Sequence, residues 1–244
     1  MLTPRKGAIM TDQAPEGESR YFVFDDGDEL VDRGTFLARE GGVELASEHF
    51  TLVRRRRRGL FRRKGGGLSV TSVIRTRDQG FVMDARVDYN RRIDPVLAES
   101  QIRARFGNEW RAWTAGFKFK PPQSRLMIST KTNPIDMNIA CEKGCMIDID
   151  PSIVPAAVLI QKFDMKKRGT QTFRWIAYAA QDAHFGINRR DVEARYVERI
   201  KAKDAEGARL KLHYLVVDER APSRGAKTAG VHRRLHLWAD DRKR

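Results

Sequence analysis

Apolar and polar residues alternate with a period of two along most of the chain after Tyr21. Alternation of this kind, bounded by clusters of Gly, Asn and Asp, is typical of antiparallel strands with one buried face. Segments 68–74 and 81–89, separated by turn residues 77–80, show it clearly. The other segments with a strand pattern are 21–24, 43–52, 100–106, 110–119, 126–130, 173–179, 191–200, 208–217 and 231–238. The chain is therefore predicted to be a β-protein.

One segment, 151–163, has the pattern of a helix instead. An acidic cap and Pro151 mark its start, and apolar residues such as Leu159 lie on most of its sides. Pro155 lacks the N–H for an intrahelical hydrogen bond, so we expect a kink or a start closer to Ser152. A helix that is apolar on most sides is stable only when it is buried.

These elements predict an all-β fold with one inserted helix: a curved antiparallel sheet, half-barrel or barrel. Strands at about 8–12-residue spacing, with no dividing linker, indicate one domain over residues 21–244. Residues 1–20 contain Pro and Gly without apolar periodicity, and we expect a flexible N-terminal arm there, with Met10 as an alternative start.

The order of the elements resembles the half-barrel of the lipoprotein and glycolipid carriers, the LolA/LolB-like fold. The segments that carry the resemblance are 43–52, 68–89, 98–119, 150–163 and 173–179. The resemblance implies a concave sheet, covered by a short helix, that holds acyl chains. It transfers no functional residue, because it rests on element order and not on a motif.

Composition narrows the protein class. Hydrophobic residues make up 41% of the 244 residues, which excludes wholesale disorder. The longest near-apolar run, 153–160, is too short to span a bilayer. The N-terminal residues lack the basic-then-apolar pattern of a secretory signal, so we expect a cytoplasmic protein.

The charge is strongly positive, at +15 from 47 basic and 32 acidic residues. Such a balance favours anionic partners, which include nucleic acid and acidic membrane surfaces. Much of the excess lies in a basic loop that we place at residues 54–67. Its candidate anion-binding residues are Arg54, Arg55, Arg56, Arg57, Arg58, Arg62, Arg63 and Lys64. The alternative is a solvated hairpin loop that its like charges keep extended.

A group of large apolar side chains is the other candidate site. In strand periodicity Trp113, Phe117 and Phe119 share one face, and Phe173 and Trp175 share another. The candidate ligand-binding residues are Trp113, Phe117, Phe119, Leu159, Phe173 and Trp175. Core packing is the alternative role for these side chains, and ligand binding requires that the sheet curves into a cup.

Motifs of catalysis and metal binding are missing from the sequence. It contains no nucleophile elbow, no phosphate-binding lysine loop and no dinucleotide fingerprint. His213, His232 and His236 would suit zinc if the last two strands pair, but spacing suggests no fourth ligand. Cys141 and Cys145 are expected to be free thiols in a turn, with a labile disulfide as the alternative. We therefore expect no metal, no cofactor and no catalytic residue.

The leading hypothesis is non-enzymatic binding of an amphipathic or apolar, lipid-like small molecule in the β-cup. The basic loop would then contact an anionic headgroup or membrane surface. One alternative is a nucleic-acid-binding protein that uses the Arg54–Lys64 run as a phosphate clamp. Another is an enzyme that acts on an apolar substrate in the cup, since fold alone does not determine function. Neither the ligand nor the oligomeric state follows from the sequence.

Overall fold

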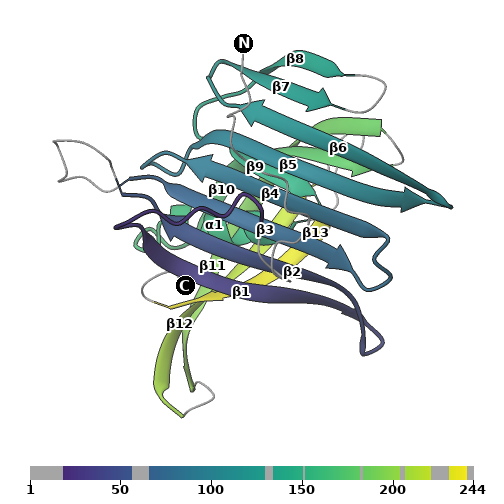
Figure 1. The fold of residues 1–244 in the computed structure, drawn as a ribbon. Helices are drawn as coiled ribbons and strands as arrows, with labels where there is room; N and C mark the ends of the chain where they lie inside the picture. Colours follow the sequence, from purple (N-terminus) through teal and green to yellow (C-terminus); the bar gives the residue numbers. More distant parts are fainter. Residues whose placement is uncertain are drawn as a thin grey trace.

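The computed structural model describes residues 19–56, 66–129, 134–150, 152–181, 184–203, 207–220 and 231–240. In this part of the chain, thirteen strands and one helix form a curved, mainly antiparallel half-barrel (Figure 1). The predicted fold class, all-β with one inserted helix, is confirmed.

The first sheet is an eight-stranded antiparallel meander in which each strand pairs with the next along the chain. Its strands are β1 (Glu29–Glu40), β2 (Val43–Arg54), β3 (Leu68–Thr76), β4 (Phe81–Tyr89), β5 (Pro95–Phe106), β6 (Glu109–Lys118), β7 (Gln123–Ser129) and β8 (Ile135–Ala140). Short turns suffice for these connections because antiparallel neighbours reverse direction.

The second sheet has five strands in the order β13-β12-β11-β10-β9. They are β9 (Met146–Asp150), β10 (Thr170–Gln181), β11 (His184–Lys203), β12 (Arg209–Arg220) and β13 (Val231–Ala239). The helix α1 (Val154–Lys162) connects β9 to β10, and these two strands pair in parallel. A parallel pair needs a crossover connection, which is the role of α1. The alternation of apolar and polar residues in the sequence did not predict that the strands form two separate sheets.

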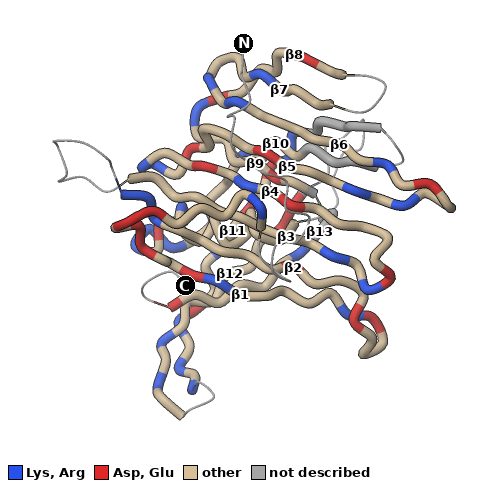
Figure 2. Tube along the Cα trace, viewed as in Figure 1, with Lys and Arg blue, Asp and Glu red and all other residues tan. Residues whose placement is uncertain are grey.

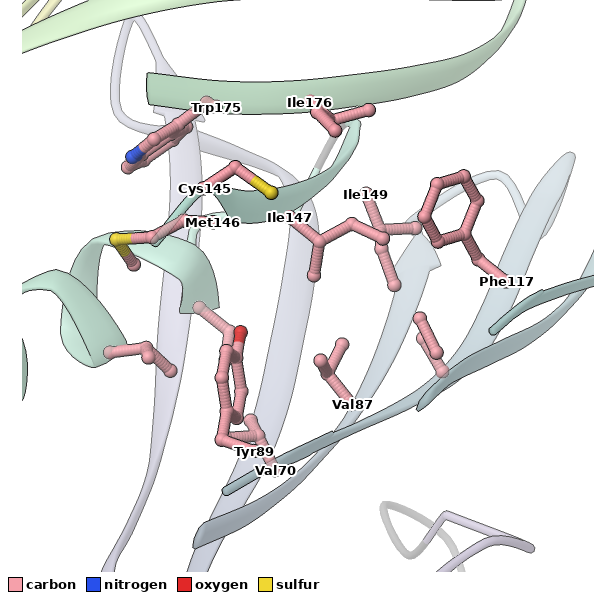
Figure 3. Close-up of a cluster of buried hydrophobic side chains, with 14 of the residues drawn as sticks. Val70, Val87, Tyr89, Phe117, Cys145, Met146, Ile147, Ile149, Trp175 and Ile176 are labelled. Atoms are coloured by element: carbon pink, nitrogen blue, oxygen red, sulfur yellow. The ribbon is translucent and has the colours of Figure 1, made fainter. Parts of the chain in front are cut away.

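The core lies between the two sheets, with α1 inside it. Figure 3 shows Val87, Tyr89 and Phe117 of the first sheet facing Ile147 and Ile149 of the second. On β3 and β4 alternate residues are buried on this side, as strand geometry requires. The buried apolar residues of the first sheet include Phe50, Leu52, Val70, Met83, Val87, Ala98, Ile102, Trp113, Phe117, Leu126 and Ile128.

The expectation of a strand at 21–24 is wrong, because these residues have no ladder partner. The segment 19–28 instead lies across the outer face of the first sheet, where the Ser19 hydroxyl and the Arg20 backbone N–H donate to the Asp84 carboxylate. Val73, which pairs with Asp84 in the ladder between β3 and β4, is also buried. The strand that sequence analysis missed nearby is β1, and it is mostly exposed. Residues 1–18 of the predicted arm lie outside the described residues.

Candidate functional site

A cleft of about 250 Å³ opens where β2 ends and β3 begins, at the base of the predicted basic loop. We call it the basic cleft. The residues that line it are Arg54, Gly66, Gly67, Leu68, Asn90, Arg91, Ile93 and Gln161. Its lining therefore combines two arginines, two residues with amide side chains and two with aliphatic side chains in one opening. Such a mixture suits a ligand with an anionic end and a short apolar part.

Two local structures shape the basic cleft. A Cβ atom on Gly67 would lie 1.7 Å from the Tyr89 carbonyl oxygen, so only glycine allows this close approach. In the connection between β4 and β5, the Asn90 side-chain oxygen accepts the backbone N–H groups of Arg92 at 2.8 Å and Asp94 at 3.1 Å. This turn holds Arg91 at the cleft.

Acidic residues partly neutralise the described part of the basic loop (Figure 2). Arg54 lies 2.8 Å from the Glu29 carboxylate, and Arg55 lies 2.7 Å from the buried carboxylate of Asp28. Burial alone would raise the pKa of Asp28, but hydrogen bonds from the Arg56 N–H and the Arg55 guanidinium outweigh it and lower the pKa. Asp28 thus stays ionised and fixes Arg55 in place.

The remaining predicted anion-binding residues lie outside the described residues; they are Arg57, Arg58, Arg62, Arg63 and Lys64. Among the described members of the predicted set, which are Arg54, Arg55 and Arg56, Arg54 lines the basic cleft. Sequence reasoning missed Arg91, because only the pairing of β3 with β4 brings the 90–94 turn next to Gly67.

Helix α1 crosses the concave face of the first sheet and is held by a buried carboxylate at its N-terminal end. The Glu48 Oε1 atom accepts the hydroxyl groups of Ser72 and Ser152, each at 2.5 Å. The Oε2 atom accepts the backbone N–H of Ile153 at 2.7 Å. A negative charge is favourable here, since the first N–H groups of a helix have no intrahelical partner.

The C-terminal end of α1 is held by Lys162. Its ammonium group donates to the Asp94 carboxylate at 3.1 Å and to the carbonyl oxygens of Gly144 at 2.9 Å and Ile93 at 3.4 Å. Ile93 also lines the basic cleft, as does Gln161 of α1. The position of α1 and the shape of the cleft are therefore connected.

Little free space remains beneath α1. A second cavity, of about 20 Å³, lies between the start of the helix and strands β3 and β4. Val70, Val87, Tyr89, Ile149 and Val154 are among the residues that line it. This volume accommodates about one water molecule. Among the described residues, the protein's own side chains thus fill most of the space between the start of α1 and strands β3 and β4.

The six predicted ligand-binding residues all lie in or against this packed interior. Trp113, Phe117, Phe119, Leu159 and Trp175 are buried, and Phe173 is half-buried against the same core. The rings of Phe117 and Phe119 are in contact, with centroids 4.2 Å apart. None of the six lines the basic cleft. Their role toward a ligand stays a prediction.

The second sheet contains a buried cluster of charged side chains that the sequence analysis did not predict. The Arg190 guanidinium lies 3.4 Å from the Glu219 carboxylate and 3.7 Å from that of Asp148, and both carboxylates are inaccessible to solvent. Burial, followed by the charge of Asp148, raises the pKa of Tyr89. The three charged residues come from β9, β11 and β12, so only the order of strands in the sheet brings them together.

Of the three histidines weighed as zinc ligands, His213 and His236 do not share a face, and the side chain of His232 lies outside the described part of the chain. Strands β12 and β13 do pair, but His213 is opposite Ala239 and His236 is opposite Val216, so the two histidines point to opposite faces. Their rings contact different tyrosines, Tyr196 and Tyr214. Among the described residues no group of three or more His, Cys, Asp and Glu side chains could hold a metal ion.

Comparisons with known proteins yield structural likeness only. No protein-family model matches the chain, and no curated protein matches it in sequence. A β-barrel-like protein of the domain of unknown function DUF1849 from Brucella abortus is similar, with a TM-score of 0.48 and 9% identity over 86% of this chain and 85% of that chain. A DUF1089 family protein from Pseudomonas aeruginosa has a TM-score of 0.34 and 12% identity over 80% and 91%, respectively.

We draw no functional conclusion from either similarity, because both TM-scores lie below 0.5. The half-barrel expected from the resemblance is confirmed, whereas the specific likeness to the LolA/LolB-like carriers stays a prediction. No helix in the described part of the chain is long and apolar enough to cross a bilayer.

Proposed function

We propose that this protein binds a small anionic amphipathic molecule without chemical conversion. The charged end of the ligand lies in the basic cleft between Arg54 and Arg91, and its apolar part runs past Leu68 and Ile93 toward α1. The observation that supports this proposal is the cleft itself, whose lining combines two arginines with the aliphatic residues Leu68 and Ile93.

The volumes determine how such a ligand would fit. A cleft of about 250 Å³ equals roughly eight water volumes, enough for a phosphate or carboxylate group and a few carbon atoms. A longer chain would have to pass beneath α1, where about 20 Å³ is free. We therefore propose that α1 moves away from the first sheet when a long-chain ligand binds. The hydrogen bonds of Glu48 and Lys162, which hold the two ends of the helix, would break first.

Alkyl phosphates of increasing chain length test the proposal by titration calorimetry, below their critical micelle concentrations. Each buried methylene contributes about 0.8 kcal/mol, or roughly fourfold in affinity. We expect this gain to continue from ethyl to octyl phosphate, with faster amide exchange in α1 once the chain exceeds a few carbons. A gain that ends at propyl or butyl phosphate would refute ligand entry beneath α1.

Substitutions test the charged end of the same site. Arg54→Ser with Arg91→Ser should weaken hexyl phosphate binding at least tenfold, because charge-assisted hydrogen bonds to the phosphate are lost. The matched control is Arg209→Ser, which removes an exposed cation on the other sheet. Equal binding by the double variant and the control, or no binding by the wild type, would overturn the proposal.

A specific feature of the second sheet favours a second candidate function, binding of nucleic acid. Strands β11 and β12 extend beyond their neighbours, since β10 pairs with β11 only up to Arg195 and β13 reaches only His213 on β12 (Figure 1). Beyond these points they form a two-stranded arm, residues 196–203 and 209–212, which we call the basic ribbon. Its exposed cations are Arg199, Lys201, Lys203, Arg209 and Lys211.

The register of β11 and β12 places these cations on one face of the basic ribbon, since they occupy alternate positions and the cations of the two strands are paired. Figure 2 shows basic residues along both strands of the arm. Lys201 is directly opposite Lys211, and Lys203 is directly opposite Arg209. Like charges directly opposite one another destabilise a strand pair, and a polyanion would relieve this repulsion. A two-stranded ribbon also fits the major groove of duplex DNA.

Fluorescence anisotropy with a generic 20-base-pair duplex tests the second candidate. Serine at positions 201, 203, 209 and 211 should flatten the salt dependence of log K by about 3–4 units if all four cations contact phosphates. The Arg54→Ser, Arg91→Ser variant is the control for general loss of positive charge. An unchanged salt slope in the ribbon variant, or no binding at low salt, would exclude this function for the ribbon.

A further inference from the structure

The two cysteines meet at the junction of the two sheets. Cys141 follows β8 and Cys145 precedes β9, and their Sγ atoms are 2.7 Å apart. A disulfide bond has an S–S length of about 2.05 Å, so bond formation needs a movement of about 0.7 Å. Both residues are free cysteines in this structure.

The turn that carries the cysteines is at the surface although their side chains point inward. Glu142 and Lys143 between them are exposed, while Cys141 and Cys145 are buried. Gly144 has a φ of 82°, which closes the turn in a conformation that favours glycine. A small oxidant therefore needs only a local opening of this turn to reach the sulfur atoms.

We propose that Cys141 and Cys145 form a modification site, at which a hydroperoxide converts the two thiols reversibly into an intramolecular disulfide. In the first step the Cys141 thiolate attacks one peroxide oxygen, the O–O bond breaks, and the departing oxygen takes up a proton. For hydrogen peroxide this gives a sulfenic acid on Cys141 and one water molecule. The Cys145 sulfur then attacks the Cys141 sulfur and displaces a second water, so that two thiols and one peroxide become one disulfide and two waters.

The environment of Cys141 and Cys145 indicates which of the two sulfur atoms attacks the peroxide. The pKa of Cys141 is lowered to about 7, first by a hydrogen bond from the Cys145 thiol and then, against the effect of burial, by the Ser124 hydroxyl and the charge of Arg189. The pKa of Cys145 is raised by the same hydrogen bond and by burial. Cys141 is therefore the thiolate and Cys145 the resolving thiol. A dithiol reductant reverses the reaction by thiol–disulfide exchange.

Lys143 makes the product easy to identify, since trypsin cleaves between the two cysteines. The reduced wild-type protein is treated with hydrogen peroxide, its remaining thiols are alkylated, and it is digested. We expect peptide 132–143 linked to peptide 144–162, with a mass lower by two hydrogen atoms than the sum of the free thiol peptides. Dithiothreitol should restore two alkylatable thiols.

Single substitutions separate the two roles. In Cys145→Ser the reaction should stop at a sulfenic acid on Cys141, which dimedone traps. In Cys141→Ser peroxide should modify Cys145 at least tenfold more slowly, because burial still raises the pKa of Cys145 when the hydrogen bond to Cys141 is lost. Recovery of both wild-type cysteines as unmodified thiols after peroxide treatment would overturn the proposal. So would disulfides that form only between molecules, or oxidation directly to sulfinic acid without a linked peptide.

Discussion

Replacement of Glu48 by alanine isolates the contact that fixes the start of α1. The carboxylate is 4% exposed and accepts three hydrogen bonds, from Ser72, Ser152 and the backbone N–H of Ile153. Hydrogen bonds to charged groups contribute about 1.5–3 kcal/mol each, but the two hydroxyl groups can turn toward other acceptors after the substitution. The N–H of Ile153 cannot, so it bears the desolvation cost of about 1–3 kcal/mol. We expect a total loss of about 3 kcal/mol in the free energy of unfolding.

Urea denaturation measures this loss. With a slope of about 2–3 kcal/mol per molar urea, the midpoint should fall by about 1–1.5 M. Glu44→Ala is the matched control, because Glu44 is exposed on the same strand and should change stability by less than about 0.5 kcal/mol. Amide exchange should accelerate in α1 and stay unchanged in β5 and β6.

Two results would refute the reasoning. A loss below about 1 kcal/mol would mean that the three donors find equivalent partners without Glu48. A loss of the expected size with unchanged exchange in α1 would mean that Glu48 stabilises the first sheet through Ser72 alone. Ser72→Ala distinguishes these cases, since it removes the hydroxyl on β3 but leaves both contacts of Glu48 to the helix start.

Three further predictions follow from other contacts. Leu159→Asp should cost several kcal/mol and prevent cooperative unfolding, measured by circular dichroism, since it buries an unpaired carboxylate at a site with 0% exposure; Leu159→Asn, of similar shape but uncharged, should cost less. The rate at which peroxide consumes the Cys141 thiol should rise about tenfold between pH 6 and pH 8, because the pKa is about 7; a midpoint near 9 in a stopped-flow titration would contradict this. Asp28, whose pKa is lowered on folding, should stabilise the protein fully above its unfolded value near 4 and lose that contribution as the pH falls through its folded pKa. The difference in stability between the wild type and Asp28→Asn should therefore shrink in acid, and a constant difference from pH 7 to pH 3 would refute the assignment.

Strand patterns with one buried face were readable from the sequence. Segments 68–74 and 81–89 alternate because one face of β3 and β4 packs on the core, and the turn at 77–80 joins them as predicted. Strand β1 was missed because most of its residues are exposed, so its apolar residues carry no period. The alternation at 21–24 resembles that of a strand, although these residues have no ladder partner and Val23 and Phe24 are exposed.

Local sequence patterns did not predict the contacts between segments that are far apart in the chain. The partition into two sheets depends on which edge strand pairs with β10, and local periodicity contains no information about that choice. Arg54 was identified as a candidate from the run of like charges, but Arg91 and Glu48 have no local signal. Arg91 lines the cleft because the fold places its turn there, and Glu48 binds the start of α1 because the fold places the helix beside β2.

The hydrogen bonds of Glu48 at the start of α1 also have a consequence for the order of folding. Neighbouring strands of the first sheet are consecutive in the chain, so they can form early by local hairpin closure. The hydrogen bond between Glu48 and Ser152 joins residues 104 positions apart, and it requires both β2 and the end of β9 to be in place. We expect α1 to dock late and to be among the first elements to detach in native-state fluctuations. The region through which we propose that a ligand enters would then also be the region that folds last and opens most readily in the native protein.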